Sequence, residues 1–548
     1  MPTSRSSRSG SADHRGRSAW IRRFAPLGAL VCLACVRGGD DRGRILVVAI
    51  DSDPGHLNPG ITTSGGTHTA AELLYNGLVE LDPLDLSPVP ELAERWTVDD
   101  EGRRYTFYLR EDVRWHDGEP FSAHDVVYSF TEVLLRFHAR TRASLGAASP
   151  EIVALDEHTV EFRFSDPYAP LLQQLNVTEA PILPRHLYEG TDPLRNPVNF
   201  APVGTGPFRF VSSRSDEELR YAANRAYFKE GLPELDAVIY RVIPDPGSQV
   251  LALEAGEVDW LFAVPGPDIE RVARLPNLEI LRSPIGPGGS NCVTTIGFNL
   301  DAAPLDDRRL REAIWHALDR DAFLERVLFG GGRVARAPIA SGIPFAHHDG
   351  LELPRHDRAR ARALLAEIGW VAEGDGRRVA RGVAGTADGT SLSLSFHHFP
   401  SQSAYAELVR AQLASVGIEI RLVTLEPPVF VEVVFRERDF DTAIVSYCNG
   451  TDPEIGVRRQ YDSAMIGPVP FSNTAGYSNA AVDSLFHRAG TTVDPGERTR
   501  LYRQIQEIVA RDLPYVWLVE SLNARAHRTR CSGFGPSGHF AETARCEG

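Results

Sequence analysis

Lysine is almost absent from this sequence: Lys229 is the single lysine, and arginine supplies all the other permanent positive charge. We interpret this scarcity as a consequence of genomic base composition rather than of chemistry. Basic residues are also outnumbered, with 58 Lys and Arg against 73 Asp and Glu, which gives a formal net charge of −15. A general nucleic-acid binder needs a basic face to meet phosphates, so this function is not expected.

Long hydrophobic runs are missing as well. The apolar run at residues 24–34 is shorter than the roughly 20 residues that span a bilayer. It follows the basic pair Arg22-Arg23, an order typical of secretory signal peptides. Its end resembles a bacterial lipobox, with Ala34 before Cys35. We therefore expect residues 1–34 to be a signal peptide and Cys35 to be lipidated, which predicts a periplasmic or cell-surface lipoprotein anchored only by lipid. Ordinary cleavage to a free protein is the alternative.

Cysteine is limited to six residues, of which two belong to the N-terminal segment. The four that remain are Cys292, Cys448, Cys531 and Cys546. An even number in an oxidising compartment favours disulfides over free thiols. Cys531 and Cys546 bracket the C-terminal tail and are one candidate pair, in which case Cys292 and Cys448 would form the other; the sequence leaves the connectivity open. No Cys/His spacing fits a zinc site, so neither a metal site nor a cofactor is expected.

Motifs for catalysis are missing too. The sequence contains neither Gly-x-Ser-x-Gly nor His-Glu-x-x-His, and Gly204-Thr205-Gly206 is too short for a phosphate-binding loop. A secreted hydrolase is therefore the weaker interpretation, and we expect no enzyme. What is present is an ordinary globular composition, with 43% apolar and 24% charged residues, in a chain long enough for about three domains.

Hydrophobic patterning predicts a mixed α/β protein. Residues 391–424 are predicted to form a β-α-β unit. Ser122 and Asp125 predict a capped helix start. Expected strands are 45–50, 105–109, 159–164, 236–243, 258–263, 391–396, 418–424, 440–447 and 514–519. Expected helices are 69–79, 247–255, 308–327, 357–368, 402–415 and 495–511.

Several motifs in one order resemble the family 5 extracellular solute-binding proteins, the oligopeptide-, dipeptide- and nickel-binding components of ABC importers. The likeness extends over about residues 45–525. Its motifs lie at 92–96 (LAERW), 105–110 (YTFYLR), 113–118 (VRWHDG), 121–128 (FSAHDVVY), 203–208 (VGTGPF), 255–259 (AGEVD), 298–299 (FN), 359–370, 473–483 and 498–514.

The resemblance implies a two-lobed periplasmic-binding-protein fold of the class II type, with an extra domain in the first lobe. The first lobe would comprise residues 45–80, 200–285 and 510–548, the extra domain 80–200, and the second lobe 286–510. Crossings near 284–290 and 505–515 would form the hinge. The resemblance also implies a monomer that captures a solute and delivers it to ABC permease subunits. A sensor that presents the same ligand to a receptor is an alternative.

The resemblance places the ligand at two backbone segments, the strand 443–448 and the loop 62–67 with Ser64 and Gly65. A buried extended peptide must pair its N–H and C=O groups, and an exposed strand edge does this for any sequence. Cys448 lies on this strand, and its bond to Cys292 would rigidify the floor of the cleft.

The sequence departs from the family pattern where a peptide's free amine would bind. The oligo- and dipeptide binders have an aspartate three residues before the Asp-Pro pair, and here Asn449 stands there. A neutral amide is a weaker partner for an ammonium than a carboxylate. Asp452 either substitutes for it or forms an Asp-Pro turn. The departure shifts weight towards blocked or modified peptides, opines, glycosides or a metal chelate.

Other candidate ligand contacts each have a structural alternative. Arg458, or its neighbour Arg459, would meet a carboxylate bidentately or pair within the protein. His397 would face the cleft, although most such histidines are satisfied within a fold. Asn299 would donate to the ligand or cap a turn. Tyr447 would offer an aromatic wall or pack in the core.

Overall fold

The computed structural model describes residues 43–83, 85–282, 291–374, 376–467, 471–522, 524–535 and 540–547. The predicted signal peptide at residues 1–34 and the lipidation site Cys35 lie outside the described residues. The predicted hinge crossing at 284–290 lies outside them too.

Seven strands form a mixed sheet in the order β12-β21-β11-β1-β10-β9-β8. At its centre, β1 (Ile45–Ile50) pairs in parallel with β10 (Ala237–Val242) and β11 (Trp260–Leu261). Alternate β1 residues pack into two separate apolar clusters, as expected for a strand covered on both faces. The antiparallel additions are β8 (Phe208–Arg214), β9 (Glu218–Ala223), β12 (Leu278–Arg282) and β21 (Ala524–Arg528).

Four antiparallel strands form a second sheet within the first half of the chain. Its order is β4 (Ala93–Asp99), β5 (Arg104–Leu109), β7 (Thr159–Arg163) and β6 (Glu151–Asp156). The predicted capping box is present, because Ser122 and Asp125 bond reciprocally at the start of α2 (Ala123–Tyr128). Short helices lie in the same part of the chain: α3 (Leu135–Phe137), α4 (Ala139–Ala143), α5 (Leu171–Gln174) and α6 (Arg185–Tyr188). Its apolar core is distinct from that of the seven-stranded sheet.

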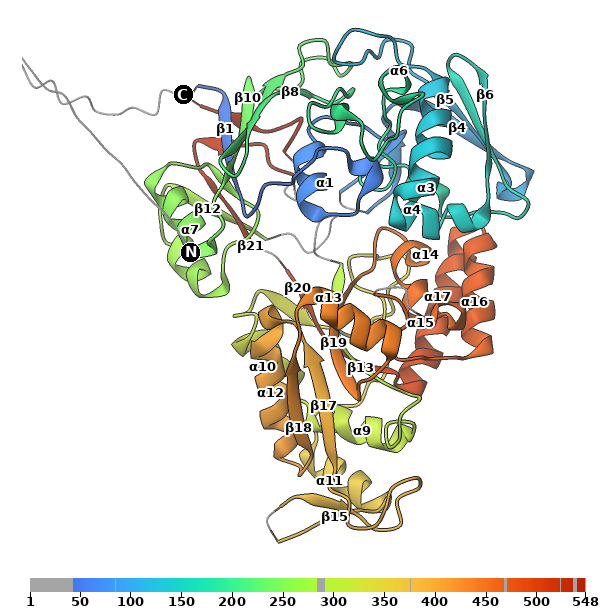
Figure 1. The fold of residues 1–548 in the computed structure, drawn as a ribbon, viewed down its shortest axis with the longest axis vertical. Helices are drawn as coiled ribbons and strands as arrows, with labels where there is room; N and C mark the ends of the chain where they lie inside the picture. Colours follow the sequence, from blue (N-terminus) through green and yellow to red (C-terminus); the bar gives the residue numbers. More distant parts are fainter. Residues whose placement is uncertain are drawn as a thin grey trace, which may run out of the picture. The chain divides into compact units, whose positions relative to one another are not determined.

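Six strands form a third sheet, in the order β14-β20-β13-β19-β17-β18. The predicted β-α-β unit is present, since β17 and β18 pair in parallel on either side of α12 (Ser403–Ala414) in the sequence. Helix α12 packs along these strands (Figure 1). The strand bounds are β13 (Cys292–Phe298), β14 (Gly332–Val334), β17 (Ser393–His398), β18 (Glu419–Thr424), β19 (Thr442–Cys448) and β20 (Tyr515–Ser521).

The single helix predicted over 308–327 is two helices, α9 (Arg308–Ala317) and α10 (Arg320–Arg326). Leu318 adopts an extended conformation, and the Asp319 side chain accepts from the Ala322 N–H to cap the second helix. A capping aspartate inside an apolar periodic run therefore divides it. The other helices in the chain are α1 (Gly65–Ala71), α7 (Pro246–Ala255), α8 (Ile269–Val272), α11 (Arg358–Glu367), α13 (Pro427–Phe430), α14 (Pro453–Gly456), α15 (Arg458–Tyr461), α16 (Ala480–Thr491) and α17 (Pro495–Asp512).

The chain completes the seven-stranded sheet only after building the six-stranded one. Strand β20 belongs to the six-stranded sheet and β21 to the seven-stranded sheet, so this passage follows residue 521. If each lobe is taken to contain one of these two sheets, the second crossing between the lobes lies later in the sequence than the expected residues 505–515. The division into lobes at the expected boundaries stays a prediction.

The C-terminal tail is fastened by the single lysine. The Lys229 Nζ atom lies 2.6 Å from Glu91 Oε2 and 2.7 Å from Glu542 Oε1. Burial disfavours the ammonium, but the two carboxylates outweigh it and raise the pKa of Lys229. This lysine thus joins three segments that are far apart in the sequence.

Candidate functional site

A cavity of about 600 Å³ opens where the parallel strands β1 and β11 end. Ligands in open α/β sheets bind outside the carboxyl ends of the strands, so this position is the expected one. The start of α1 also contributes to the cavity wall. The lining residues are Ala49, Ile50, Asp51, Ser52, Gly65, Gly66, Thr69, Pro246, Gln249, Phe262, Ala263, Val264 and Pro265.

Gly65 is thus one predicted ligand residue that lines this cavity, and Ser64 precedes it. Both residues are exposed. The Ser64 side chain makes no capping bond to α1, and a Cβ added at Gly65 would meet nothing within 4 Å. This loop therefore has space beside it and a side-chain hydroxyl that the helix does not use.

Strand β19 has one edge that its neighbours only partly cover. Strand β13 pairs along its whole length, from Phe298–Thr442 to Cys292–Cys448. Strand β17 pairs with the other edge only at Phe396–Thr442 and His397–Ala443. Within the described residues, the edge from Ile444 to Cys448 therefore has no strand partner. An edge of this kind can receive an extended backbone as an added strand.

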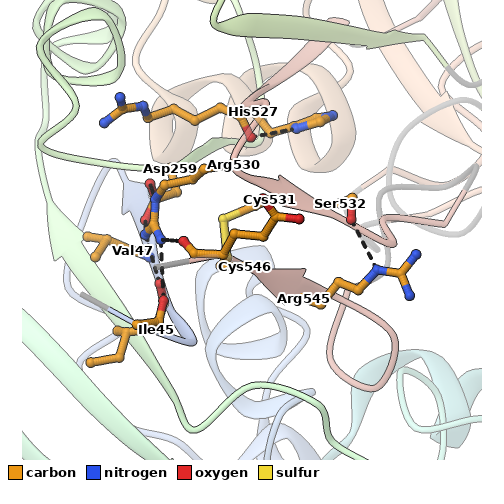
Figure 2. The surroundings of a disulfide bond; sticks show 12 residues. Ile45, Val47, Asp259, His527, Arg530, Cys531, Ser532, Arg545 and Cys546 are labelled. Atoms are coloured by element: carbon orange, nitrogen blue, oxygen red, sulfur yellow. Dashed lines mark hydrogen bonds and ion pairs between the residues drawn. A yellow bond between two sulfur atoms is a disulfide. The ribbon is translucent and has the colours of Figure 1, made fainter. Parts of the chain in front are cut away.

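Both predicted disulfides are present. Cys292–Cys448 joins β13 to β19 at the end of this edge. Cys531–Cys546 closes the C-terminal tail beside Arg530, whose guanidinium donates to both oxygens of the buried Asp259 at 2.8 and 2.7 Å (Figure 2). The two bonds agree with export to an oxidising compartment.

Asn449 is fully buried and its side chain is engaged within the protein. Its Oδ1 accepts from the Ala340 N–H at 2.6 Å, and its Nδ2 donates to the Tyr447 carbonyl at 3.4 Å. The backbone N–H donates to the Asn291 carbonyl at 3.0 Å. The amide thus fastens the end of β19 to the chain near Ala340.

Asp452 is also fully buried, and it forms an ion pair with Arg498. The Arg498 Nη2 donates to both Asp452 oxygens, at 3.0 and 2.8 Å. Burial opposes the charge on Arg498, but Asp452 raises the pKa of the guanidinium. Asp452 also caps α14, with Pro453 in the first turn. Its contacts are those of the Asp-Pro turn alternative, not of a free countercharge.

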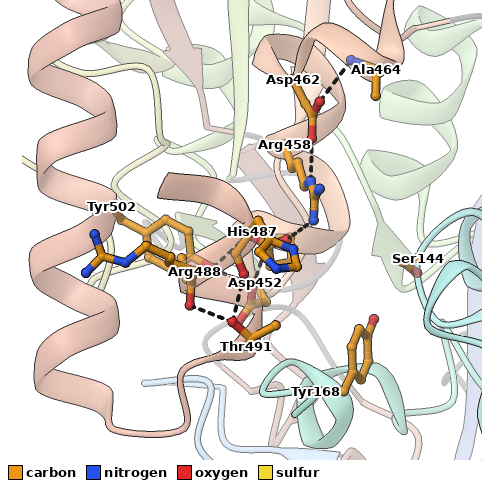
Figure 3. Close-up of polar contacts among 12 residues, drawn as sticks. Ser144, Tyr168, Asp452, Arg458, Asp462, Ala464, His487, Arg488, Thr491 and Tyr502 are labelled. Atoms are coloured by element: carbon orange, nitrogen blue, oxygen red, sulfur yellow. Dashed lines mark hydrogen bonds and ion pairs between the residues drawn. The ribbon is translucent and has the colours of Figure 1, made fainter. Parts of the chain in front are cut away.

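Arg458, the first residue of α15, is paired with a carboxylate of α14 and with one that follows α15. Its guanidinium lies 3.0 Å from Glu454 and 2.7 Å from Asp462 (Figure 3). Carboxylates four residues before and after an arginine in helical sequence already indicate this pairing. Arg459 faces elsewhere, and donates to the carbonyls of Gly456 at 3.2 Å and Cys448 at 3.4 Å.

His397, Asn299 and Tyr447 are all buried, and none lines the cavity described above. Burial lowers the pKa of His397, which lies edge-on to the Phe440 ring. Asn299 Oδ1 accepts from the Asp301 N–H at 3.3 Å, as a turn-capping residue does, and its Nδ2 donates to the Phe440 carbonyl at 2.9 Å. Tyr447 donates to the Ser472 carbonyl at 2.8 Å. Their contacts match the structural alternatives for these residues.

The segment around Asp452 also touches the first half of the chain. Thr451 Oγ1 donates to the Gln173 carbonyl at 3.0 Å, and the Ala169 N–H donates to the Gly490 carbonyl at 3.0 Å. Tyr168 lies opposite Asp452 and Thr491 in Figure 3. These contacts tie the region of the four-stranded sheet to the helices that follow β19.

The buried Glu454 carboxyl should make the free energy of unfolding of the protein depend on pH. Burial raises its pKa from 4.5 to about 7, against the opposing charge of Arg458. The folded state then binds a proton that the unfolded state releases, so stability falls as pH rises from about 4.5 to about 7. E454Q should match the wild type near pH 5 and exceed it by about 2–4 kcal/mol near pH 8, measured by urea unfolding.

The matched control for this measurement is E497Q. Glu497 is a half-exposed carboxylate whose hydrogen bond with Arg500 lowers its pKa. E497Q should therefore gain no stability as pH rises. Equal pH dependence in E454Q and the wild type would contradict the role assigned to Glu454.

Two further observations concern metal binding and membrane-spanning helices. The described residues hold no group of three or more His, Cys, Asp or Glu side chains that is arranged to bind a metal ion. Among the same residues, no helix is both long and apolar enough to cross a membrane.

The chain builds one α/β sheet, crosses to a second and returns to complete the first, with an extra antiparallel sheet in its N-terminal part. This is the two-lobed binding-protein fold of the class II type, as predicted. Residues 87–464 match the family described as "Bacterial extracellular solute-binding proteins, family 5 Middle". The chain belongs to this family, whose members bind solutes for ABC importers outside the cytoplasm.

Similar proteins include binders of different solutes. The chain is 27% identical to the dipeptide-binding protein of Escherichia coli over 518 residues, which covers 90% of this chain and 92% of the relative. It is 28% identical to the glutathione-binding protein GsiB of Salmonella typhi over 497 residues, with 89% and 91% covered. NikA from Brucella suis, solved in complex with Fe(III)-EDTA, has a TM-score of 0.80 at 25% identity, with 91% and 99% covered.

Proposed function

We propose that this protein captures a peptide or peptide-like solute between its lobes and hands it to the permease subunits of an ABC importer. The edge of β19 from Ile444 to Cys448, which has no strand partner among the described residues and is exposed at Ser446 and Cys448, carries this proposal. It offers backbone pairing to a solute of any side-chain sequence. The cavity beside Gly65 gives room for side chains. The dipeptide- and glutathione-binding relatives support a solute of this chemical class.

A solute without a free ammonium group is the second candidate, and the residues after β19 favour it. Asn449 is neutral, and Asp452 is neutralised by Arg498, so neither gives an unpaired carboxylate at the family's amine-binding position. Blocked peptides, opines, glycosides and metal chelates meet this condition. NikA from Brucella suis, which has a similar fold, was solved in complex with Fe(III)-EDTA, and this supports a chelate as one candidate. Presentation of the ligand to a receptor, as a sensor, would use the same contacts.

The proposal also includes the processing and the oligomeric state that the sequence predicts for the mature protein. Cleavage after Ala34, lipidation of Cys35 and a monomeric state belong to it. Ser64, Gly65 and the backbone of Cys448 are its ligand contacts. Among the other predicted contacts, we assign Asn299, His397, Tyr447, Asn449, Asp452 and Arg458 to supporting the site through their internal bonds.

Native mass spectrometry of the protein, purified gently from its own secretory compartment, tests the proposal. A ladder of added masses that fit short peptides is the expected result for general peptide import. One discrete added mass would instead identify a dedicated solute and contradict general peptide capture. An empty protein that also fails to bind a tetrapeptide library would contradict both.

A further inference from the structure

Arg459 is an arginine without a carboxylate partner at the end of the uncovered edge. Its neighbours Arg458 and Arg498 both form ion pairs with carboxylates. Within the described residues, no carboxylate oxygen lies within 4 Å of the Arg459 guanidinium. Its partners are two neutral carbonyls, those of Gly456 and Cys448, at 3.2 and 3.4 Å. Both distances are long for an N–H···O bond.

The surroundings of Arg459 make its charge costly. Burial lowers the pKa of the guanidinium, which means that the charged form loses hydration that its partners do not replace. Arg459 is half-buried, so its charge is only partly hydrated, and an unpaired charge in such a place gains from an anionic partner. An anion is therefore the group that this arginine lacks.

A second arginine adds to the positive charge. Arg140 in α4 lowers the pKa of Arg459, while Glu179 raises it. Glu179 is already bound to Arg140, with Oε2 at 3.0 Å from Nε. Glu179 pairs with Arg140 and forms no ion pair with Arg459, so one carboxylate offsets two guanidinium charges and these three groups keep an excess positive charge.

Two nearby histidines leave this excess unchanged. His68 in α1 and His138 lie edge-to-face, with ring centroids 5.8 Å apart. Burial lowers their pKa values to about 4 and about 3. Both are neutral at pH 7, so they add no charge to that of Arg140, Glu179 and Arg459.

Arg459 is also within reach of a solute. The contact of its Nη2 with the Cys448 carbonyl is exposed to solvent, and the Cys448 residue itself is exposed. Arg459 is only partly buried, unlike Asn449 and Asp452 beside it. At this end of the β19 edge, the charge that remains available to a ligand is thus positive.

We infer that Arg459 binds a carboxylate of the captured solute, with Arg140 adding to the attraction. The inference rests on the proposed function and defines its solute class: an acid whose carboxylate lies beside Cys448 and which brings no ammonium group there. A guanidinium pairs bidentately with a carboxylate, so the contact also orients the solute along the edge. It requires no metal and no covalent step.

The first experiment compares N-acetylated tetrapeptide libraries that end in a free carboxylate or in an amide. Capture is measured by native mass spectrometry on wild type, R459Q, R459K and the control R488Q. The wild type is expected to prefer the acid library by about tenfold or more. R459Q should lose the preference, and R459K should keep part of it. Arg488 is exposed and pairs with Glu497, so R488Q should behave as the wild type.

The second experiment measures the thermal midpoint with citrate as a small carboxylate probe, against choline chloride of equal ionic strength. Citrate should raise the midpoint of the wild type and leave that of R459Q unchanged. Without any ligand, the midpoint of R459Q should not fall, because the substitution removes an uncompensated charge. A purely structural arginine would give a lower midpoint.

The outcomes separate the two proposals. Equal capture of both libraries, with R459Q unaltered, would leave peptide binding standing and overturn the role of Arg459. Capture of neither library would overturn peptide binding. The effect of citrate on the thermal midpoint would then decide whether Arg459 binds a carboxylate. A citrate effect that persists in R459Q, or a midpoint of R459Q that falls without ligand, would overturn the inference.

Discussion

Replacement of Arg498 by methionine is expected to lower the free energy of unfolding by about 3–5 kcal/mol. The substitution keeps most of the side-chain volume but leaves the fully buried Asp452 carboxylate without the Arg498 Nη2 group that donates to both of its oxygens. Asp452 would keep only the Glu454 N–H at 3.0 Å and the Tyr502 hydroxyl at 3.4 Å. Chemical denaturation at pH 7, followed by circular dichroism, measures the change.

Two further variants make this prediction specific. Arg500 lies on the same helix, is exposed and pairs with Glu497, so R500M should cost less than about 1 kcal/mol. The double variant D452L/R498M removes both charges and should recover a large part of the loss. A loss in R498M no greater than that in R500M would show that the buried pair does not hold this region together.

Removal of the Cys292–Cys448 disulfide, as C292A/C448A, is expected to lower the free energy of unfolding by about 4–5 kcal/mol. The bond links residues 156 positions apart, so it removes a large part of the unfolded chain's freedom. It also holds the end of β19 against β13. The variant should therefore bind its solute more weakly as well as unfold more readily, measured by denaturation and by native mass spectrometry.

The second disulfide is the matched control. Cys531–Cys546 links residues only 15 positions apart, and its removal should cost about 3 kcal/mol. It lies in the tail beside Arg530 (Figure 2), and neither of its cysteines belongs to β19. C531A/C546A should therefore leave solute binding unchanged. A greater loss in this variant than in C292A/C448A would contradict the loop-length argument.

Local sequence patterns predicted much of the fold. The capping box at Ser122 and Asp125 and the unit from β17 to β18 are short-range features, and both are present. The break between α9 and α10 also had a local signal in Asp319, which the apolar periodicity of residues 308–327 obscured. Strand β20 was predicted, but its sheet depends on long-range pairing with β13.

The candidate site was less predictable, because its partners are distant in the sequence. Asp452 meets Arg498 46 residues away, and Asn449 meets Ala340 109 residues away. No local spacing indicates either contact. The choice between Arg458 and Arg459 did have a signal, since Glu454 and Asp462 flank Arg458 at helical spacing. The sequence did not indicate that the charges of Arg140 and Glu179, which are distant along the chain, act on Arg459 in the folded protein.

The single lysine has a practical consequence for anyone who handles this protein. Amine-directed reagents have one side-chain target in the whole chain, and that target is held between Glu91 and Glu542 with a raised pKa. A protonated amine is a poor nucleophile, so acylation of Lys229 should be slow while the tail is fastened and fast once it detaches. One mass increment would then report tail release without an engineered label. Amine coupling to a sensor surface would, for the same reason, be confined to this residue and the chain's amino terminus.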